Sequence, residues 1–252
     1  MRKTVWVLVA FLFAVHVSYA QKEVQFKFNP KTGEPLKMKL FSETETSGAQ
    51  EMIMEMEMDM QYFPKEEKDG VFTIENVIDD LKVNMMVGMQ TISYNSKEEP
   101  EDEMSKMIGE QFSALIDQKI VTYINEEGKT IDVEFSGAEM ASMDMSSMTK
   151  NLTAAFPDHP VKPGDSWTQE LTDNELTGTS VVINYTYKEE NDEGYVLDIQ
   201  GEVKDNSENS VGTMEGYYLL DKDTHITKKS EVMMNMSNMG MEISNHITMT
   251  LE

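Results

Sequence analysis

A methionine stands at every second position from residue 52 to residue 60, and Glu55, Glu57 and Asp59 lie between them. Successive side chains of a β-strand point to opposite faces, so this pattern places all five methionines on one face and the carboxylates on the other. The segment therefore predicts a strand with one apolar face and one charged face.

Similar alternation recurs along most of the chain and predicts a mainly β protein. Before residue 100 the expected strands cover 24–28, 36–40, 71–78 and 81–94, and a hairpin of two strands is expected over 120–124 and 131–135. In the last third, strands are expected at 166–171, 179–187, 194–203, 212–220, 226–236 and 241–251.

The middle of the chain has a different period. Apolar residues from Met104 to Ile116 recur at three- and four-residue spacing, which predicts one helix. The acidic run at 98–103 precedes it and suits the positive end of a helix dipole. A second helix, or a pair of helices, is expected over 138–155.

Two β-rich parts around a helical middle indicate a mainly β (α+β) fold. We expect one long, curved antiparallel sheet, or an open half-barrel, with two or three helices packed on its concave face. In its order of elements this arrangement resembles the half-barrel of exported lipid-carrier proteins. A β-sandwich of two sheets is the alternative.

The first twenty residues have the pattern of a cleavable signal peptide. Arg2 and Lys3 precede an apolar run over 5–17 that is too short to span a bilayer, and small residues lead to cleavage between Ala20 and Gln21. We therefore expect an exported protein, periplasmic or secreted, without an integral membrane span. The expected organisation is one β-rich domain at 21–252, with a β half at 21–97, a helix and hairpin middle at 98–160 and a β half at 161–252.

Composition excludes several classes of site. The chain has no cysteine, which rules out disulfides, thiolate metal sites and cysteine nucleophiles. Its 46 acidic and 21 basic residues give a net charge of −25, which repels nucleic acid and anionic membrane surfaces. Arg2 is the sole arginine, so bidentate phosphate clamps are absent once the signal peptide is removed.

Nothing in the sequence predicts an enzyme or a cofactor. The residues Gly164-Asp165-Ser166 superficially resemble a nucleophile motif, but a proline-rich turn precedes them instead of a buried strand. His159, His225 and His246 show no spacing typical of a catalytic triad or a metal site.

The 23 methionines are the most unusual feature of the composition, and they permit three interpretations. They can replace leucine as core filler, line an adaptable cavity for lipophilic ligands, or bind Cu(I) through their thioethers. The residues expected to line a cavity are Met54, Met56, Met58, Met107, Ile108 and Phe112. The residues expected for the copper alternative are Met56, Met58 and Met60, or Met239, Met241 and His246.

The stretch from Pro160 to Trp167 reads Pro-Val-x-x-Gly-Asp-x-Trp. It resembles a stretch of uncharacterised exported bacterial proteins that form a family of unknown function. Those proteins also have a signal peptide, a preceding hairpin and a β-rich C-terminal part. The resemblance implies a bacterial envelope location and transfers no catalytic residue.

These observations favour a non-enzymatic binding module for a lipophilic small molecule or a hydrophobic segment of an envelope protein. A methionine-based Cu(I) protein and a purely structural or interaction domain are the alternatives.

Overall fold

The computed structural model describes residues 23–48, 51–100, 102–116, 118–135, 153–174, 179–238 and 240–252. The expected signal peptide with its cleavage site between Ala20 and Gln21 lies outside these residues, as do Met239 and most of the second expected helix.

A single open sheet of twelve strands, antiparallel at every pairing of neighbours, makes up the fold. Its strand order is β6-β5-β3-β2-β1-β12-β11-β10-β9-β8-β7, and β4 pairs with the part of β3 that β5 leaves free. The strands are β1 (Leu36–Ser47), β2 (Met52–Lys68), β3 (Val71–Val87), β4 (Gln90–Asn95), β5 (Lys119–Asn125), β6 (Thr130–Phe135), β7 (Ser166–Asn174), β8 (Thr179–Glu190), β9 (Tyr195–Asp205), β10 (Ser210–Leu220), β11 (Thr227–Asn238) and β12 (Met241–Leu251).

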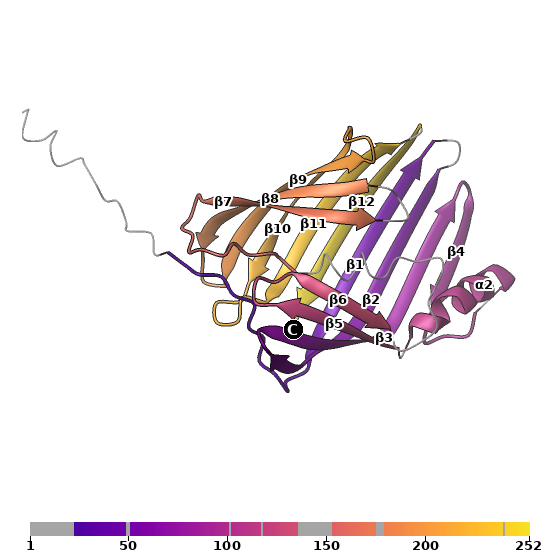
Figure 1. Cartoon of the computed structure of the whole chain (residues 1–252). Coiled ribbons are helices and arrows are strands. Elements are labelled where there is room, and N and C mark those ends of the chain that lie inside the picture. Colours follow the sequence, from indigo (N-terminus) through magenta and orange to yellow (C-terminus); the bar gives the residue numbers. More distant parts are fainter. Residues whose placement is uncertain are drawn as a thin grey trace, which may run out of the picture.

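The first and last strands lie side by side at the centre of this sheet. β1 pairs with β12 from Met38 opposite Leu251 to Ser47 opposite Glu242. This pairing, the β1–β12 seam, joins the strands before residue 136 to the strands after residue 165. Figure 1 shows the sheet curving so that β5–β6 and β7–β8 turn toward the same side.

The expectation of two or three helices on the concave face is wrong. The described residues contain one α-helix, α2 (Glu103–Phe112), followed by the 3-10 turn η1 (Ser113–Leu115). This helix packs beside β4 at the edge of the sheet, where Gly109 lies close against the ring of Tyr94. No helix in the described part of the chain is long and apolar enough to cross a membrane.

Local chemistry explains where α2 begins and why it stays at the edge. The Asp102 side chain accepts a hydrogen bond from the Ser105 amide at 2.8 Å, which caps the helix N-terminus. Ile108 and Phe112 are buried, whereas Met104 and Met107 are 47% and 68% exposed. The helix therefore packs with one side only and leaves its methionines outside the core.

The two-sheet alternative is also wrong, because one sheet includes every strand from residue 36 to residue 251. The hairpin expected at 120–135 is confirmed as β5 and β6. The break expected between residues 78 and 81 is a bulge inside the continuous strand β3, and the chain reverses instead at Gly88, which has a φ of +62°.

The segment expected as a first strand crosses the concave side of the sheet instead of joining it. This strap, residues 23–30, buries Val24, Phe26, Phe28 and Pro30 on alternate positions. The Phe28 amide donates to the Glu126 carbonyl at 2.7 Å, and the Asn29 amide donates to the Thr224 carbonyl at 3.0 Å. The strap thus joins the β5–β6 turn to the β10–β11 turn, across both parts of the sheet.

Phe26 of the strap is the centre of an aromatic cluster between the strap and the sheet. Its ring lies 5.3 Å from the ring of Tyr187, 5.4 Å from Tyr195 and 5.6 Å from Phe156, measured between centroids. The contacts with Tyr187 and Tyr195 are edge-to-face, and such contacts add to the free energy gained by burial. The aromatic cluster closes one end of the concave side.

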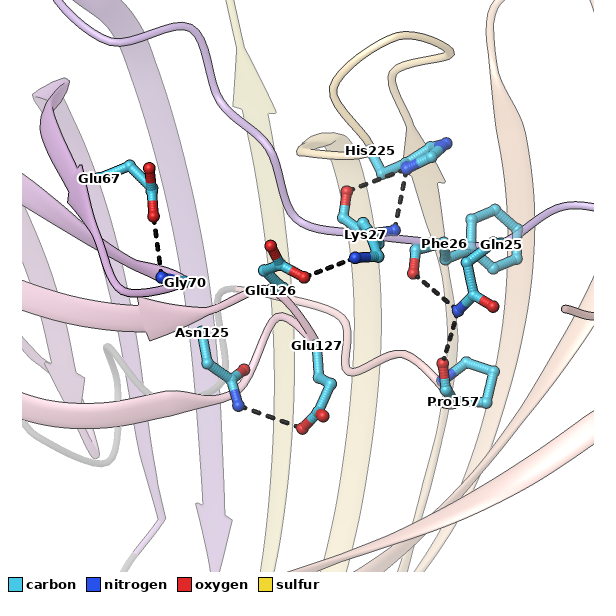
Figure 2. Close-up of polar contacts among 10 residues, drawn as sticks. All are labelled: Gln25, Phe26, Lys27, Glu67, Gly70, Asn125, Glu126, Glu127, Pro157 and His225. Carbon is cyan, nitrogen blue, oxygen red and sulfur yellow. Dashed lines mark hydrogen bonds and ion pairs between the residues drawn. The ribbon is translucent and has the colours of Figure 1, made fainter. Parts of the chain in front are cut away.

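A histidine contacts the strap from the β10–β11 turn (Figure 2). His225 Nδ1 lies 3.1 Å from the Lys27 amide nitrogen and 3.0 Å from the Lys27 carbonyl oxygen, and Lys27 Nζ forms an ion pair with Glu126 at 2.6 Å. Burial lowers the pKa of His225. The neutral ring accepts a hydrogen bond from the Lys27 amide, and protonation of Nδ1 would exchange it for one donated to the Lys27 carbonyl, so burial is what disfavours the charged ring.

Replacement of Phe26 tests the strap. We expect Phe26→Ala to lower the free energy of unfolding by about 3–5 kcal/mol, because it leaves a cavity among the aromatic rings. Guanidinium denaturation followed by tryptophan fluorescence measures the loss. Phe63→Ala, on the half-buried opposite face of β2, is the control and should lose less; equal losses would show that the strap carries no special packing.

His225 should make stability depend on pH. The unfolded histidine takes up its proton near pKa 6.5, whereas the folded one resists it, so its contribution is complete above pH 6.5 and declines as the pH falls toward the folded pKa. We expect the chain to lose more stability between pH 7.5 and pH 5.5 than His225→Asn. Asparagine tolerates the positive φ of 53° at this position, retains a δ-acceptor and does not titrate. Identical pH profiles would exclude this role of His225.

Candidate ligand-binding face

The concave side of the sheet, here called the inner face, is continuous across the seam. In β2 the even-numbered residues from Met52 to Tyr62 lie on it, and their partners across the β1–β2 and β2–β3 ladders share the same side. The strap packs on this face, since Phe28 contacts Phe72 of β3 and Phe26 contacts Tyr187 of β8. The other side is called the outer face.

Strand register arranges the inner face in rows that run from β3 to β8. The deep row consists of Val83, Met56, Ser42, Ile247, Val232, Gly216, Ile199 and Tyr185. The middle row consists of Met85, Met54, Thr44, Asn245, Met234, Met214, Gly201 and Ile183. The rim row consists of Val87, Met52, Thr46, Ile243, Met236, Gly212, Val203 and Val181.

Charge is absent from these three rows. None of their residues is aspartate, glutamate, lysine, arginine or histidine. The neighbouring outer-face positions are acidic instead, as Glu55 and Glu57 of β2, Glu215 of β10 and Glu231 of β11 illustrate. The large negative charge of the chain therefore lies outside an uncharged inner face.

More residues are buried in the deep row than in the middle or rim row. In the deep row Val83, Met56 and Ile199 are 0%, 5% and 2% exposed, and burial raises the pKa of Tyr185 to about 12. Almost every residue of the middle and rim rows is partly exposed, including the methionines of β2, β10 and β11. On the inner face, the middle and rim rows thus leave apolar surface accessible at the end opposite the strap.

A groove of about 560 Å³ opens at this end, where the β1–β2 and β11–β12 hairpins meet β10. Met52, Met236, Ile243 and Gly212 of the rim row line it. Outer-face and hairpin residues complete the lining, among them Glu45, Glu51 and Glu242. The rim row thus contributes apolar residues to the groove, and the glutamates make part of its lining acidic.

The structure separates the residues expected to line a cavity. Met56 and Met58 lie in the core at 5% and 3% exposure, and Met54 is partly exposed in the middle row. Ile108 and Phe112 are buried on α2, beside β4 instead of opposite β2. Met107 is 68% exposed and does not face the methionine strand.

Of the copper alternative, Met56, Met58 and Met60 share the inner face of β2, whereas Met241 and His246 are not brought together. Met241 and His246 are separated by an odd number of positions in β12, so they lie on opposite faces. His246 Nε2 lies 3.2 Å from the Glu231 carboxylate on the outer face. Met239 lies outside the described residues, and Met60 is buried at 6% exposure within the apolar core.

Sequence reasoning missed Met85, Met214 and Met234, which share the middle row with Met54. It also missed three polar residues at the seam, Ser42, Thr44 and Asn245. A signal existed for the polar residues: each occupies the phase of its strand that otherwise carries apolar residues, such as Met38 and Leu40 in β1 or Ile243 and Ile247 in β12.

Comparison with known proteins relates part of the sequence to a family and the whole sheet to a known fold. The model of a family of unknown function (DUF6263) matches residues 137–252. The comparison with curated proteins found no match.

The comparison with solved structures gave one match that shows a similar fold and one of low structural similarity. A lipovitellin structure, reported for its lipid–protein interactions, superposes with a TM-score of 0.56 at 10% identity and covers 88% of this chain and 25% of that one. This chain therefore corresponds to about a quarter of the lipovitellin chain. A Bacteroides fragilis protein with a YmcC-like fold gives a TM-score of 0.33 at 11% identity and covers 91% of this chain and 100% of that one.

Proposed function

We propose that this chain is an exported, non-enzymatic binding module that holds a lipophilic ligand against the middle and rim rows of its inner face. The observation that carries the proposal is the middle row, in which Met85, Met54, Met234 and Met214 are partly exposed on an uncharged surface that crosses the sheet.

The physical chemistry of these side chains supports a lipophilic ligand. Apolar surface removed from water contributes about 25 cal/mol per Å², or about 0.8 kcal/mol for each buried methylene. Methionine is unbranched and polarizable, so a methionine-lined surface can repack around alkyl chains of different shape. The strap closes one end of the inner face and leaves the rim end as the entrance.

The fold comparison gives separate support. A region of lipovitellin with a similar fold belongs to a protein whose structure was reported for lipid–protein interactions. Export is supported by the charged, apolar and small-residue pattern of residues 1–20.

Affinity should rise with the length of the ligand's alkyl chain. We expect the affinity for a homologous series of methyl esters to increase about fourfold per methylene until the inner face is covered, since each methylene contributes about 0.8 kcal/mol. Displacement of the neutral fluorescent dye Nile red measures it. Saturable dye binding without any dependence on chain length would contradict the proposal, and so would no dye binding.

Two double variants, which change neighbouring positions on opposite faces of β3 and β11, locate the site. We expect Met85→Glu combined with Met234→Glu to weaken dye and ester binding more than tenfold, because it places carboxylates in the middle row. The matched control is Met86→Glu combined with Met233→Glu, on the outer face, where these methionines are 46% and 41% exposed. Unfolding curves of both variants verify the fold. Equal weakening by the two pairs would place the site elsewhere.

A further inference from the structure

A polar patch interrupts the apolar middle row at the β1–β12 seam. Thr44 and Asn245 are direct cross-strand partners there, and they separate Met54 on one side from Met234 on the other. Ser42 of the deep row donates a hydrogen bond to Asn245 Oδ1 at 3.4 Å. Both ends of the middle row are apolar, so the patch lies near the centre of the proposed binding surface.

The amide nitrogen of Asn245 has hydrogen-bonding capacity that the protein does not use. Among the described residues, none accepts a hydrogen bond from Asn245 Nδ2. Asn245 is partly exposed and lies in the middle row of the inner face. An apolar ligand that covered this donor without accepting from it would incur the desolvation cost of an unpaired polar group.

The charge distribution limits what the ligand's polar group can be. A carboxylate or phosphate placed on the inner face would meet no lysine, arginine or histidine in any of the three rows and would lose its hydration without a counter-charge. An anionic head group left at the rim would meet Glu45, Glu51 and Glu242 of the groove, within the Debye length of about 8–10 Å. Both placements disfavour an anionic lipid.

We propose that the ligand is an uncharged lipid ester whose carbonyl oxygen accepts a hydrogen bond from Asn245 at the seam while its alkyl chains extend along the methionines on both sides. This inference rests on the proposed function and adds to it the chemical class of the ligand. Ser42 holds the amide through the hydrogen bond that it donates to Asn245 Oδ1, and the partly exposed Thr44 supplies a hydroxyl group for the second ester oxygen.

Three ligands of matched length separate the contributions of the acyl surface, the carbonyl and the charge. Methyl oleate, 1-octadecene and oleate at pH 8 are each delivered from cyclodextrin and compete with Nile red on the unmodified chain. We expect methyl oleate to bind about tenfold more tightly than 1-octadecene, as one good hydrogen bond allows, and more than tenfold more tightly than oleate. Added salt should reduce the penalty of oleate if its head group stays at the rim.

A substitution then assigns the carbonyl preference to Asn245. Asn245→Leu should remove the advantage of methyl oleate over 1-octadecene and leave the affinity for 1-octadecene unchanged or higher. Asn235→Leu, on the exposed outer face of β11, is the control and should preserve the advantage. Thr44→Val is a second variant, with a smaller change in volume. It should reduce the ratio of the affinity for methyl oleate to the affinity for 1-octadecene.

The outcomes distinguish this inference from the proposed function. Displacement by all three ligands with equal affinity would overturn the ester assignment and leave a lipophilic site in place. Tighter binding of oleate than of methyl oleate would also overturn it. Absence of displacement by every ligand would overturn the proposed function and this inference together.

Discussion

Pairing between the first and last strands is the constraint on which the rest of this structure depends. The β1–β12 seam joins two hairpin-connected sets of strands into one sheet. Its register places Met38, Leu40 and Ser42 in line with Leu251, Met249 and Ile247. Because the side-chain period of a strand is two, a shift of one residue at the seam would turn one whole set of apolar residues to the outer face.

This continuity also determines how charge is distributed. The strands place the uncharged residues of the three rows in one phase and most of their acidic residues in the other, so a sheet with aligned phases has an uncharged inner face and an acidic outer face. The outer face carries acidic residues of a chain whose net charge is −25, and this charge disfavours contacts between copies through mutual repulsion. The inner face is then covered by the strap at one end and left partly accessible at the other.

Much of the strand pattern could be predicted because its signals are local. The hairpin of β5 and β6 and the strands β7 to β12 follow from alternation and from turn residues between them. The helix was expected from Met104 to Ile116 and is found at Glu103–Phe112, since its spacing signal is local too. Its position was not predictable, because an apolar stripe does not specify which surface will cover it, and α2 packs against Tyr94 at an edge. Residues 24–28 have the alternation of a strand, yet they form the strap, because their backbone partners come from turns far away in the chain.

The sequence by itself determined the strand content, the separation of charged from apolar positions, and the presence of an unusual number of methionines. These are properties of neighbouring residues and need no knowledge of the fold. The tertiary structure alone decided which methionines share a row, that Met241 and His246 lie on opposite faces, and that Asn245 meets Thr44 across the seam. Those facts depend on pairing and register between strands about two hundred residues apart, and no local pattern specifies a register of that range.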